Sequence, residues 1–232
     1  MSRRPLTLAY VGFAVLGALV LGAFLREHFT SPHTPQPAPI AKPATPSLPD
    51  PSGAIPRIRP LFTLPDLAGH RRAITDWDGH ALIVNFWATW CAPCRREIPL
   101  LNSLATEYAS KNVKVVGIAV DFAADVQTFI AHTPLQYDLL IGEEEGLDAA
   151  RGFGVDSLVF PFTAFTDQSG HLLVVHLGEL HADQAHAILD VVEQVNHGTL
   201  PLNAARKAID QALTALPSTG AASAETNKTA LQ

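Results

Sequence analysis

Two cysteines occur in the 232 residues of the chain, Cys91 and Cys94, and only two residues separate them. The preceding run Ala81–Ala88 is apolar apart from Asn85, which is typical of a buried strand. A helical pattern follows, from about 92 to 110. The pair therefore stands at a strand-to-helix junction, with Cys91 at the start of the helix and Cys94 one turn further on. This placement requires a fold in which a core strand leads directly into a helix N-terminus.

The position of the pair indicates redox chemistry. Unpaired backbone N–H groups and the helix dipole favour an anion at a helix N-terminus, so Cys91 should ionise readily to a nucleophilic thiolate. Two such thiols exchange electrons with a partner disulfide through a mixed disulfide. One alternative is a structural disulfide, although so short a loop would stabilise by only about 2 kcal/mol. The other is a zinc site, although zinc needs about four ligands and the ten histidines form no second close ligand pair.

Residues 57–200 alternate short apolar runs with helical patterns and should form one domain. Besides the strand before Cys91, strands are expected at 113–120 and 137–142 and a hairpin at 161–180. Besides the helix after it, helices are expected at 125–132, 145–154 and 182–198. This order predicts an α/β fold in which a mixed central sheet carries helices on both faces.

The N-terminus carries a membrane-spanning pattern. The segment Leu6–Leu25 holds 20 uncharged residues, about 30 Å as a helix, which matches a hydrocarbon core. Arg3 and Arg4 precede it, so 1–28 should be a signal-anchor of the inner (cytoplasmic) membrane, with the N-terminus inside and the rest of the chain in the periplasm. The alternative is a cleaved signal peptide, but the run is long and no clean small-x-small site precedes Arg26.

Three further segments flank the domain. Residues 29–56 form a linker with nine prolines, which should be an extended spacer of up to roughly 80 Å, simple disorder being the alternative. Residues 201–216 should form an amphipathic helix that has Asn203 as its N-cap and packs on the domain, a dimer contact being the alternative. Residues 217–232 should be a disordered tail. The net charge of −6 gives no indication of the basic face that nucleic acid requires, so no nucleic acid is expected as a partner.

The stretch "FWATWCAPCRREIP" resembles the active site of the thioredoxin superfamily, and specifically of the membrane-anchored TlpA/ResA-type thiol-disulfide oxidoreductases. The similarity covers roughly 60–197 and includes the lead-in "LFTLPDLAGHRRAITDWDGHALIVNFWATWC". It implies a thioredoxin-like fold, a redox-active Cys91–Cys94 disulfide, and neither cofactor nor metal.

The resemblance also assigns roles along the chain. Pro161 matches the proline that the family holds cis beside the disulfide, and Pro99 the proline that kinks the active-site helix. The substrate-binding residues implied are Trp90, Ala92, Pro93 and Phe160.

The resemblance extends in part to the acidic positions of the family. Asn85 stands where thioredoxins proper have a buried aspartate, and cannot ionise. Asp121 matches an acid that follows the next strand in ResA-like members, so it is expected to accept the Cys94 proton during resolution. The alternative is that Asp121 caps a helix beginning near Phe122. Glu97 matches a frequent family acid and is interpreted as stabilising the first turn of its helix.

The implied function is that of a membrane-tethered protein-disulfide reductase acting on oxidised, exported proteins and reset by a transmembrane electron donor. Apocytochrome c, in cytochrome c-type biogenesis, and copper-site proteins are the substrates the family implies. A disulfide oxidase or isomerase on the same fold is one alternative. A copper-binding chaperone is another, although those of related fold place three residues between the cysteines. A thiol peroxidase is a third, although its Pro-x-x-x-Thr-x-x-Cys signature is absent.

Overall fold

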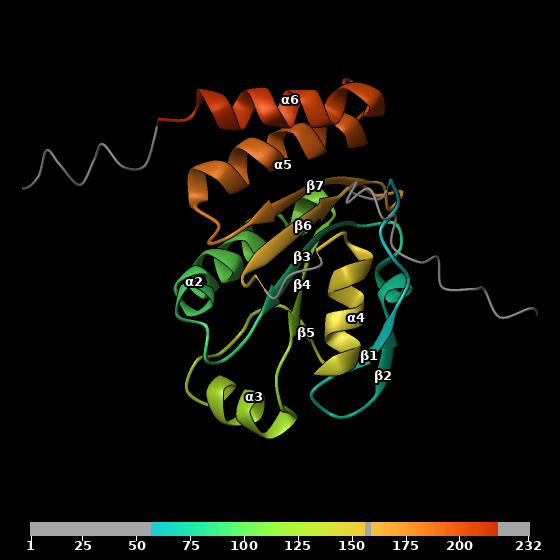
Figure 1. Ribbon diagram of the computed structural model, residues 1–232. Coiled ribbons are helices and arrows are strands. Elements are labelled where there is room, and N and C mark those ends of the chain that lie inside the picture. Colours follow the sequence, from blue (N-terminus) through green and yellow to red (C-terminus); the bar gives the residue numbers. More distant parts are fainter. Residues whose placement is uncertain (1–56, 156–158, 218–232) are drawn as a thin grey trace, which may run out of the picture. The chain divides into compact units, whose positions relative to one another are not determined.

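The computed structural model describes residues 57–155 and 159–217 (Figure 1). The predicted signal-anchor (1–28), the linker (29–56) and all but the first residue of the tail (217–232) lie outside the described residues. Within the described ranges, no helix has both the length and the apolar character needed to cross a bilayer.

A five-stranded mixed sheet forms the centre of the domain, in the order β5-β4-β3-β6-β7. The strands β5, β4 and β3 pair parallel to one another, whereas β6 is antiparallel to both of its neighbours, β3 and β7. Every residue of β3 is buried, because this central strand is covered on both faces, which explains its continuous apolar run. The predicted mixed sheet is confirmed. Its strands are β3 (Ala81–Trp87), β4 (Val113–Ala119), β5 (Asp138–Ile141), β6 (Phe162–Thr166) and β7 (Leu172–Leu177).

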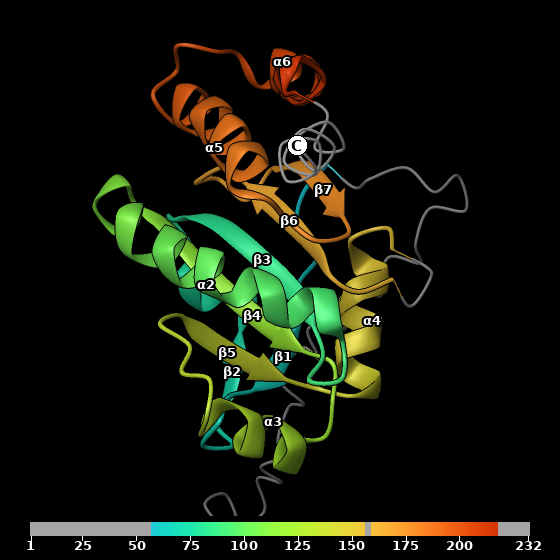
Figure 2. The same cartoon turned by 90° about the vertical axis from the view of Figure 1, so that its left-hand side faces the viewer.

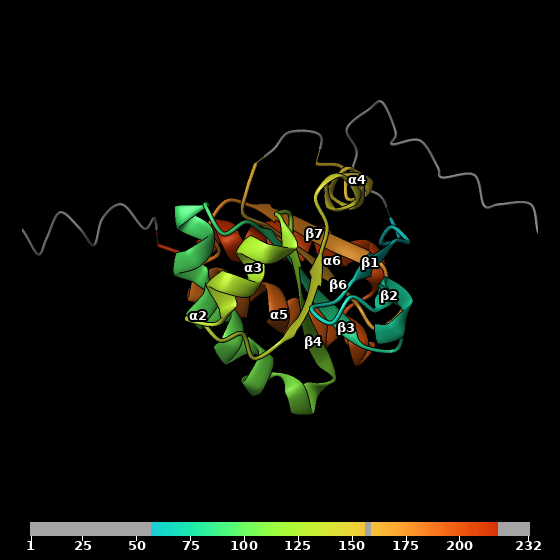
Figure 3. The ribbon, with the colours of Figure 1, turned by 90° about the horizontal axis from the view of Figure 1, so that it is seen from below.

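Helices cover both faces of the sheet, as predicted. Alternate residues of β3 point to opposite faces, so Ile83 and Trp87 contribute to the cores beneath one set of helices and Val84 and Phe86 to the core on the other side. On the first face lie α2 (Ala92–Glu107), α3 (Ala123–Ile130) and α5 (Ala182–Asn196) (Figure 2). Seen from below, α2 and α3 lie together on one side (Figure 3).

The second face is covered by α4 (Glu144–Gly152) and by a small N-terminal unit. That unit is an antiparallel pair, β1 (Thr63–Pro65) and β2 (Arg71–Ala73), followed by the 3-10 helix η1 (Ile74–Trp77). Its three-residue strands were not predicted, because segments this short carry too little alternation to be recognised. The unit buries Leu64 of β1 and Ile74 and Trp77 of η1 against the sheet.

The C-terminal amphipathic helix is present as α6 (Leu202–Ala215) and packs on α5 through Ala205 and Ile209. The predicted N-cap of α6 is wrong, and the alternative role of Asp121 as an N-cap is excluded. The N-cap of α6 is Pro201, not Asn203, since proline fixes an extended backbone there and the helix already begins at Leu202. Asp121 does not cap α3, whose N-cap is Phe122 with no side-chain cap.

Candidate redox site

Cys91 and Cys94 form a disulfide at the N-terminus of α2, with their Cα atoms 5.3 Å apart. Cys91 is the N-cap residue, with extended backbone, and its Sγ accepts a hydrogen bond from the backbone N–H of Cys94 at 3.3 Å. Pro93 occupies the first turn, where no N–H is needed. The predicted strand-to-helix junction is confirmed, and the helix terminus offers the Cys91 sulfur a hydrogen-bond donor.

Solvent access distinguishes the two sulfur-bearing residues. Cys91 is 5% exposed and Cys94 is 0% exposed. The neighbouring Trp90 is 66% exposed. Both cysteines are buried, and Cys91 keeps the small exposure of the pair, so we expect an incoming sulfur atom to meet Cys91 first and Cys94 to react with a group already bound to Cys91.

The substrate-binding residues implied by the resemblance gather around this sulfur. The Phe160–Pro161 peptide bond is cis, as predicted. The Phe160 ring lies 6.2 Å from the Trp90 ring, centroid to centroid, and packs against the cluster that contains both cysteines. Ala92 is exposed at the first position of α2. Segments 70 residues apart in the chain thus form one rim beside Cys91.

Asp121 lies in the loop between β4 and α3, and its hydrogen bonds go to Thr89, in the loop that leads into the site, and to its own neighbour Phe122. The carboxylate accepts from the Thr89 backbone N–H at 3.0 Å, from the Thr89 hydroxyl at 2.6 Å, and from the Phe122 N–H at 2.9 Å. Thr89 precedes Trp90, so these bonds hold the residues immediately before Cys91. The proposed transfer of a proton from Cys94 to Asp121 stays a prediction.

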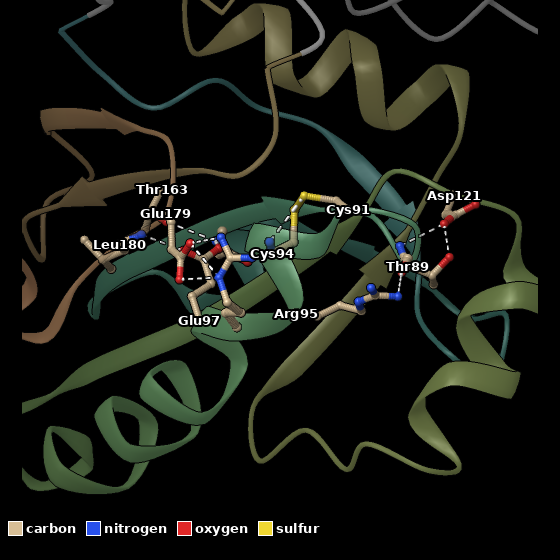
Figure 4. The surroundings of a disulfide bond; sticks show 11 residues. Thr89, Cys91, Cys94, Arg95, Glu97, Asp121, Thr163, Glu179 and Leu180 are labelled. Atoms are coloured by element: carbon tan, nitrogen blue, oxygen red, sulfur yellow. Dashed lines mark hydrogen bonds and ion pairs between the residues drawn. A yellow bond between two sulfur atoms is a disulfide. The ribbon is translucent and has the colours of Figure 1, made fainter. Parts of the chain in front are cut away.

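Glu97 is a buried ionisable group on the inward side of α2. It is 2% exposed and is the sixth residue of α2, beyond the first turn it was expected to stabilise, so that interpretation is wrong. Its two oxygens accept from Asn85 Nδ2 at 2.7 Å and from the Leu180 backbone N–H at 2.8 Å. Asn85 also donates to the Thr163 hydroxyl at 3.0 Å. Figure 4 shows Glu97 with Leu180 and Thr163 on one side of the disulfide and Asp121 with Thr89 on the other.

Burial raises the pKa of Glu97 to about 7, against the lowering effect of the hydrogen bonds from Leu180 and Asn85. The negative charge of Glu179 raises it further. Cys94 and Glu97 are three residues apart on α2 and both face inward, so this carboxyl group lies on the same face of the helix as the buried sulfur. A carboxyl that titrates near neutral pH is suited to accepting and returning a proton there.

The turn between β7 and α5 connects the acid to the substrate rim. The Gly178 N–H donates to the Pro161 carbonyl at 2.9 Å, and two residues later the Leu180 N–H binds Glu97. Gly178 has a φ of +91°, a conformation that favours glycine. On the outer side of the turn, Arg96 forms an ion pair with Glu179, and its hydrogen bonds lower the pKa of that carboxylate.

No group of three or more histidine, cysteine or acidic side chains suited to a metal ion occurs in the ranges 57–155 and 159–217.

Comparison with known proteins gives consistent matches over this domain. A sequence model described as "AhpC/TSA family" matches residues 56–175. The thioredoxin-like protein YneN of Bacillus subtilis is 30% identical over 138 residues, which cover 57% of this chain and 76% of that protein. The thiol-disulfide oxidoreductase ResA of Geobacillus thermodenitrificans is 28% identical over 135 residues, which cover 58% and 75%. A crystal structure from Chlorobium tepidum, described as a thiol:disulfide interchange protein DsbE, is 27% identical with a TM-score of 0.54, covering 60% of this chain and 98% of that one.

Proposed function

The chain belongs to the AhpC/TSA family and is a thiol-disulfide oxidoreductase of the ResA type, and we propose that it works as a reductase of disulfides in exported proteins. The observation that carries the proposal is the asymmetry of the sulfur pair. Cys91, the N-cap of α2, keeps 5% exposure beside an exposed tryptophan, whereas Cys94 has none and shares the inward face of the helix with a buried acid.

The reaction follows from this arrangement. In the reduced protein, the Cys91 thiolate attacks a substrate disulfide, the substrate S–S bond breaks, and a mixed disulfide forms while the leaving thiolate takes up a proton. The Cys94 thiolate then attacks the Cys91 sulfur and releases the second substrate thiolate. Two electrons pass to the substrate, and the Cys91–Cys94 disulfide remains. Trp90 and Phe160 hold the substrate chain against the Cys91 sulfur.

Glu97 accepts the proton of Cys94 in the second step. Its pKa of about 7, raised chiefly by burial, allows the carboxylate to take a proton near neutral pH and to release it again. Asp121 acts through Thr89, whose backbone and hydroxyl it holds, and therefore positions the loop that presents Trp90 and Cys91.

The setting of the reaction is proposed from the N-terminal sequence. An uncharged run of 20 residues behind Arg3 and Arg4 supports a single-pass anchor in the inner membrane, with the catalytic domain in the periplasm on the proline-rich linker. Reduction in that compartment consumes the dithiol, so a transmembrane electron donor must restore it. Apocytochrome c or a copper-site protein is the proposed substrate class, as the resemblance implies.

Two variants test the redox mechanism as a matched pair, since each removes one sulfur and the disulfide with it. Cys91→Ser should abolish reduction of insulin disulfides, and Cys94→Ser should accumulate mixed disulfides that a gel without reductant resolves. Insulin reduction by Cys91→Ser at the wild-type rate would refute the mechanism. Absence of any adduct with Cys94→Ser would refute the resolving role of Cys94.

Separate measurements test the direction of electron transfer, the alternative functions and the cellular location of the protein. A strongly oxidising reduction potential would favour an oxidase or isomerase. Tight copper binding by the reduced protein would favour a chaperone, and peroxide consumption a peroxidase. Recovery of the full-length chain in the membrane fraction, with the domain digested by protease added to the periplasm, is expected for the anchored form. Recovery in the soluble periplasmic fraction would show a cleaved signal peptide instead.

A further inference from the structure

Two consecutive residues of α2 contact two consecutive residues of the turn between β7 and α5. At the surface, Arg96 forms an ion pair with Glu179. In the interior, Glu97 accepts a hydrogen bond from the Leu180 backbone N–H at 2.8 Å. Figure 4 shows Glu179 and Leu180 together on the side of the disulfide where Glu97 lies. An exposed contact and a buried one therefore lie side by side between the same two segments.

The exposed contact has a geometry that orients both side chains. Arg96 Nε lies 3.1 and 3.0 Å from the two carboxylate oxygens of Glu179, and Arg96 Nη2 binds the second of them as well. A planar guanidinium that binds a carboxylate through two nitrogen atoms constrains the pair more than a single contact does. The side chains are 60% and 21% exposed, so solvent screens the attraction and the pair stabilises the fold little. Its effect is on the position of the turn.

The backbone of the same turn is held by the sheet. The Glu179 carbonyl oxygen lies 3.3 Å from His176 Nε2, on β7. One residue earlier, the Gly178 N–H donates to the Pro161 carbonyl at 2.9 Å. These contacts fix the turn against the strands, and the pair with Arg96 links its exposed side chain to α2.

The Leu180 N–H affects the proton affinity of Glu97. A backbone N–H that donates to a carboxylate favours the ionised form. Because Glu179 and Leu180 are adjacent, a turn released from Arg96 can carry the Leu180 N–H away from the carboxylate. Glu97 would then keep its proton at neutral pH in more of the molecules.

We propose that Arg96 is a positioning residue of the redox site, whose ion pair with Glu179 holds the Leu180 N–H against the Glu97 carboxylate. Its consequence for catalysis rests on the proposed function of Glu97 as the acceptor of the Cys94 proton. With the pair intact, the ionised carboxylate takes the proton from the Cys94 sulfur, and the thiolate attacks the mixed disulfide. Without the pair, more molecules hold a protonated Glu97, so the Cys94 thiol keeps its proton for longer.

The other titratable groups around Glu97 do not replace this contact. Burial raises the pKa of Tyr137, so its phenol stays neutral while Glu97 titrates. Burial lowers the pKa of His176, so this ring loses its proton at a lower pH than Glu97 does. Glu179 is paired at the surface, and His181, the N-cap of α5, interacts with Glu179 and His176. Among the described residues, none of these side chains donates a hydrogen bond to Glu97.

The test measures the ionisation of Glu97 in the oxidised full-length chain, purified in mild detergent. Infrared spectroscopy follows the protonated carboxyl band as the pH is raised, and Glu97→Gln identifies this band by removing it. Arg96→Met keeps the aliphatic stem and should raise the midpoint by about half a pH unit or more, the scale of an exposed ion pair. Lys111→Met is the matched control, because it removes another exposed ion pair, with Glu193 at 2.8 Å, beyond the C-terminal end of α2. The control should leave the midpoint unchanged.

A second variant separates the position of the turn from the charge on it. Arg96→Met alone leaves the Glu179 charge unpaired, which would itself favour the protonated form of Glu97. Arg96→Met/Glu179→Gln removes both charges and keeps the net charge, so it should still raise the midpoint by about half a pH unit. A return of this double variant to the wild-type midpoint would assign the effect to charge alone and overturn the positioning role. An unchanged midpoint in Arg96→Met would overturn it as well.

The lifetime of the mixed disulfide with insulin, measured by rapid acid quench, tests the consequence for catalysis. A midpoint raised from about 7 by half a unit lowers the ionised fraction at pH 7 from about a half to about a quarter. Arg96→Met should therefore lengthen the lifetime about twofold at pH 7 and leave it unchanged at pH 9, where Glu97 is ionised in both proteins. Equal lengthening at both pH values would show a structural role alone and overturn the proposal. A lifetime that Glu97→Gln leaves unchanged would instead refute the proposed function of Glu97, whatever the infrared midpoints.

Discussion

Replacement of Glu97 by glutamine should change how the stability of the oxidised protein depends on pH. In the wild type, burial raises the pKa of this carboxyl from 4.5 to about 7, so the folded state binds the proton more tightly than the unfolded state does. The resulting stabilisation is complete below about pH 4.5 and is lost as the pH rises through about 7. Glutamine has no proton to lose, so the variant should not show this loss.

The size of the effect follows from the two pKa values. Each unit of pKa difference corresponds to about 1.4 kcal/mol. The difference between 4.5 and about 7 therefore predicts that, from low to high pH, the free energy of unfolding of the wild type falls by about 3 kcal/mol relative to that of the variant. At low pH the two proteins should be similarly stable, because the glutamine carbonyl can accept from Leu180 and its amide can donate to a flipped Asn85.

Urea unfolding of both oxidised proteins at several values between about pH 4.5 and pH 8.5 measures the difference directly. The comparison with the variant is necessary because His176 also affects the pH dependence. Burial lowers the pKa of His176, so its contribution to the free energy of unfolding is lost as the pH falls, whereas that of Glu97 is lost as the pH rises. Both proteins contain His176, so its contribution cancels. A stability difference that stays constant over this range would refute the assignment of a raised pKa to Glu97.

Two further substitutions test the roles of Asp121 and Trp90. The first separates a positioning role from proton transfer, and the second separates substrate binding from the sulfur chemistry. Asp121→Asn should lower the free energy of unfolding by about 1–3 kcal/mol, because a single amide oxygen replaces a carboxylate that accepts from both Thr89 and Phe122. Its insulin-reduction rate should keep the wild-type pH profile, and loss of the acidic limb of that profile would instead identify Asp121 as the proton acceptor. Trp90→Ala should change the stability by less than about 0.5 kcal/mol, since the side chain is 66% exposed. It should lower kcat/KM for insulin about tenfold but spare a small disulfide such as oxidised glutathione, and an equal loss with both would contradict a binding role.

The parts of the fold that the sequence predicted are those specified locally. The runs of β3 and β4 are apolar because both faces of these strands are covered. The helix expected at 182–198 is α5, which ends at Asn196, just before Gly198 with its φ of +71°. The cysteine pair and the cis proline followed from the motif and the resemblance.

The surroundings of the acid could not be predicted, because they depend on contacts between distant segments. The Leu180 N–H that binds Glu97 lies 83 residues further along the chain. A glutamate on a helix is normally exposed, so no local pattern distinguishes this one from a surface residue. The one available signal was the mismatch of an acid on the inward stripe of α2, next to Ile98 and one turn before Leu101.

The turn formed by Gly178, Glu179 and Leu180 joins two properties that enzymes of this kind could otherwise adjust separately. One of its N–H groups fixes the carbonyl of Pro161, where a visiting chain would lie, and another fixes the carboxyl of Glu97. A shift of this short segment must alter both bonds at once. The protonation of Glu97 and the binding of the visiting chain beside Pro161 are therefore coupled through this turn. A mutation in the turn that changes one of them will also change the other.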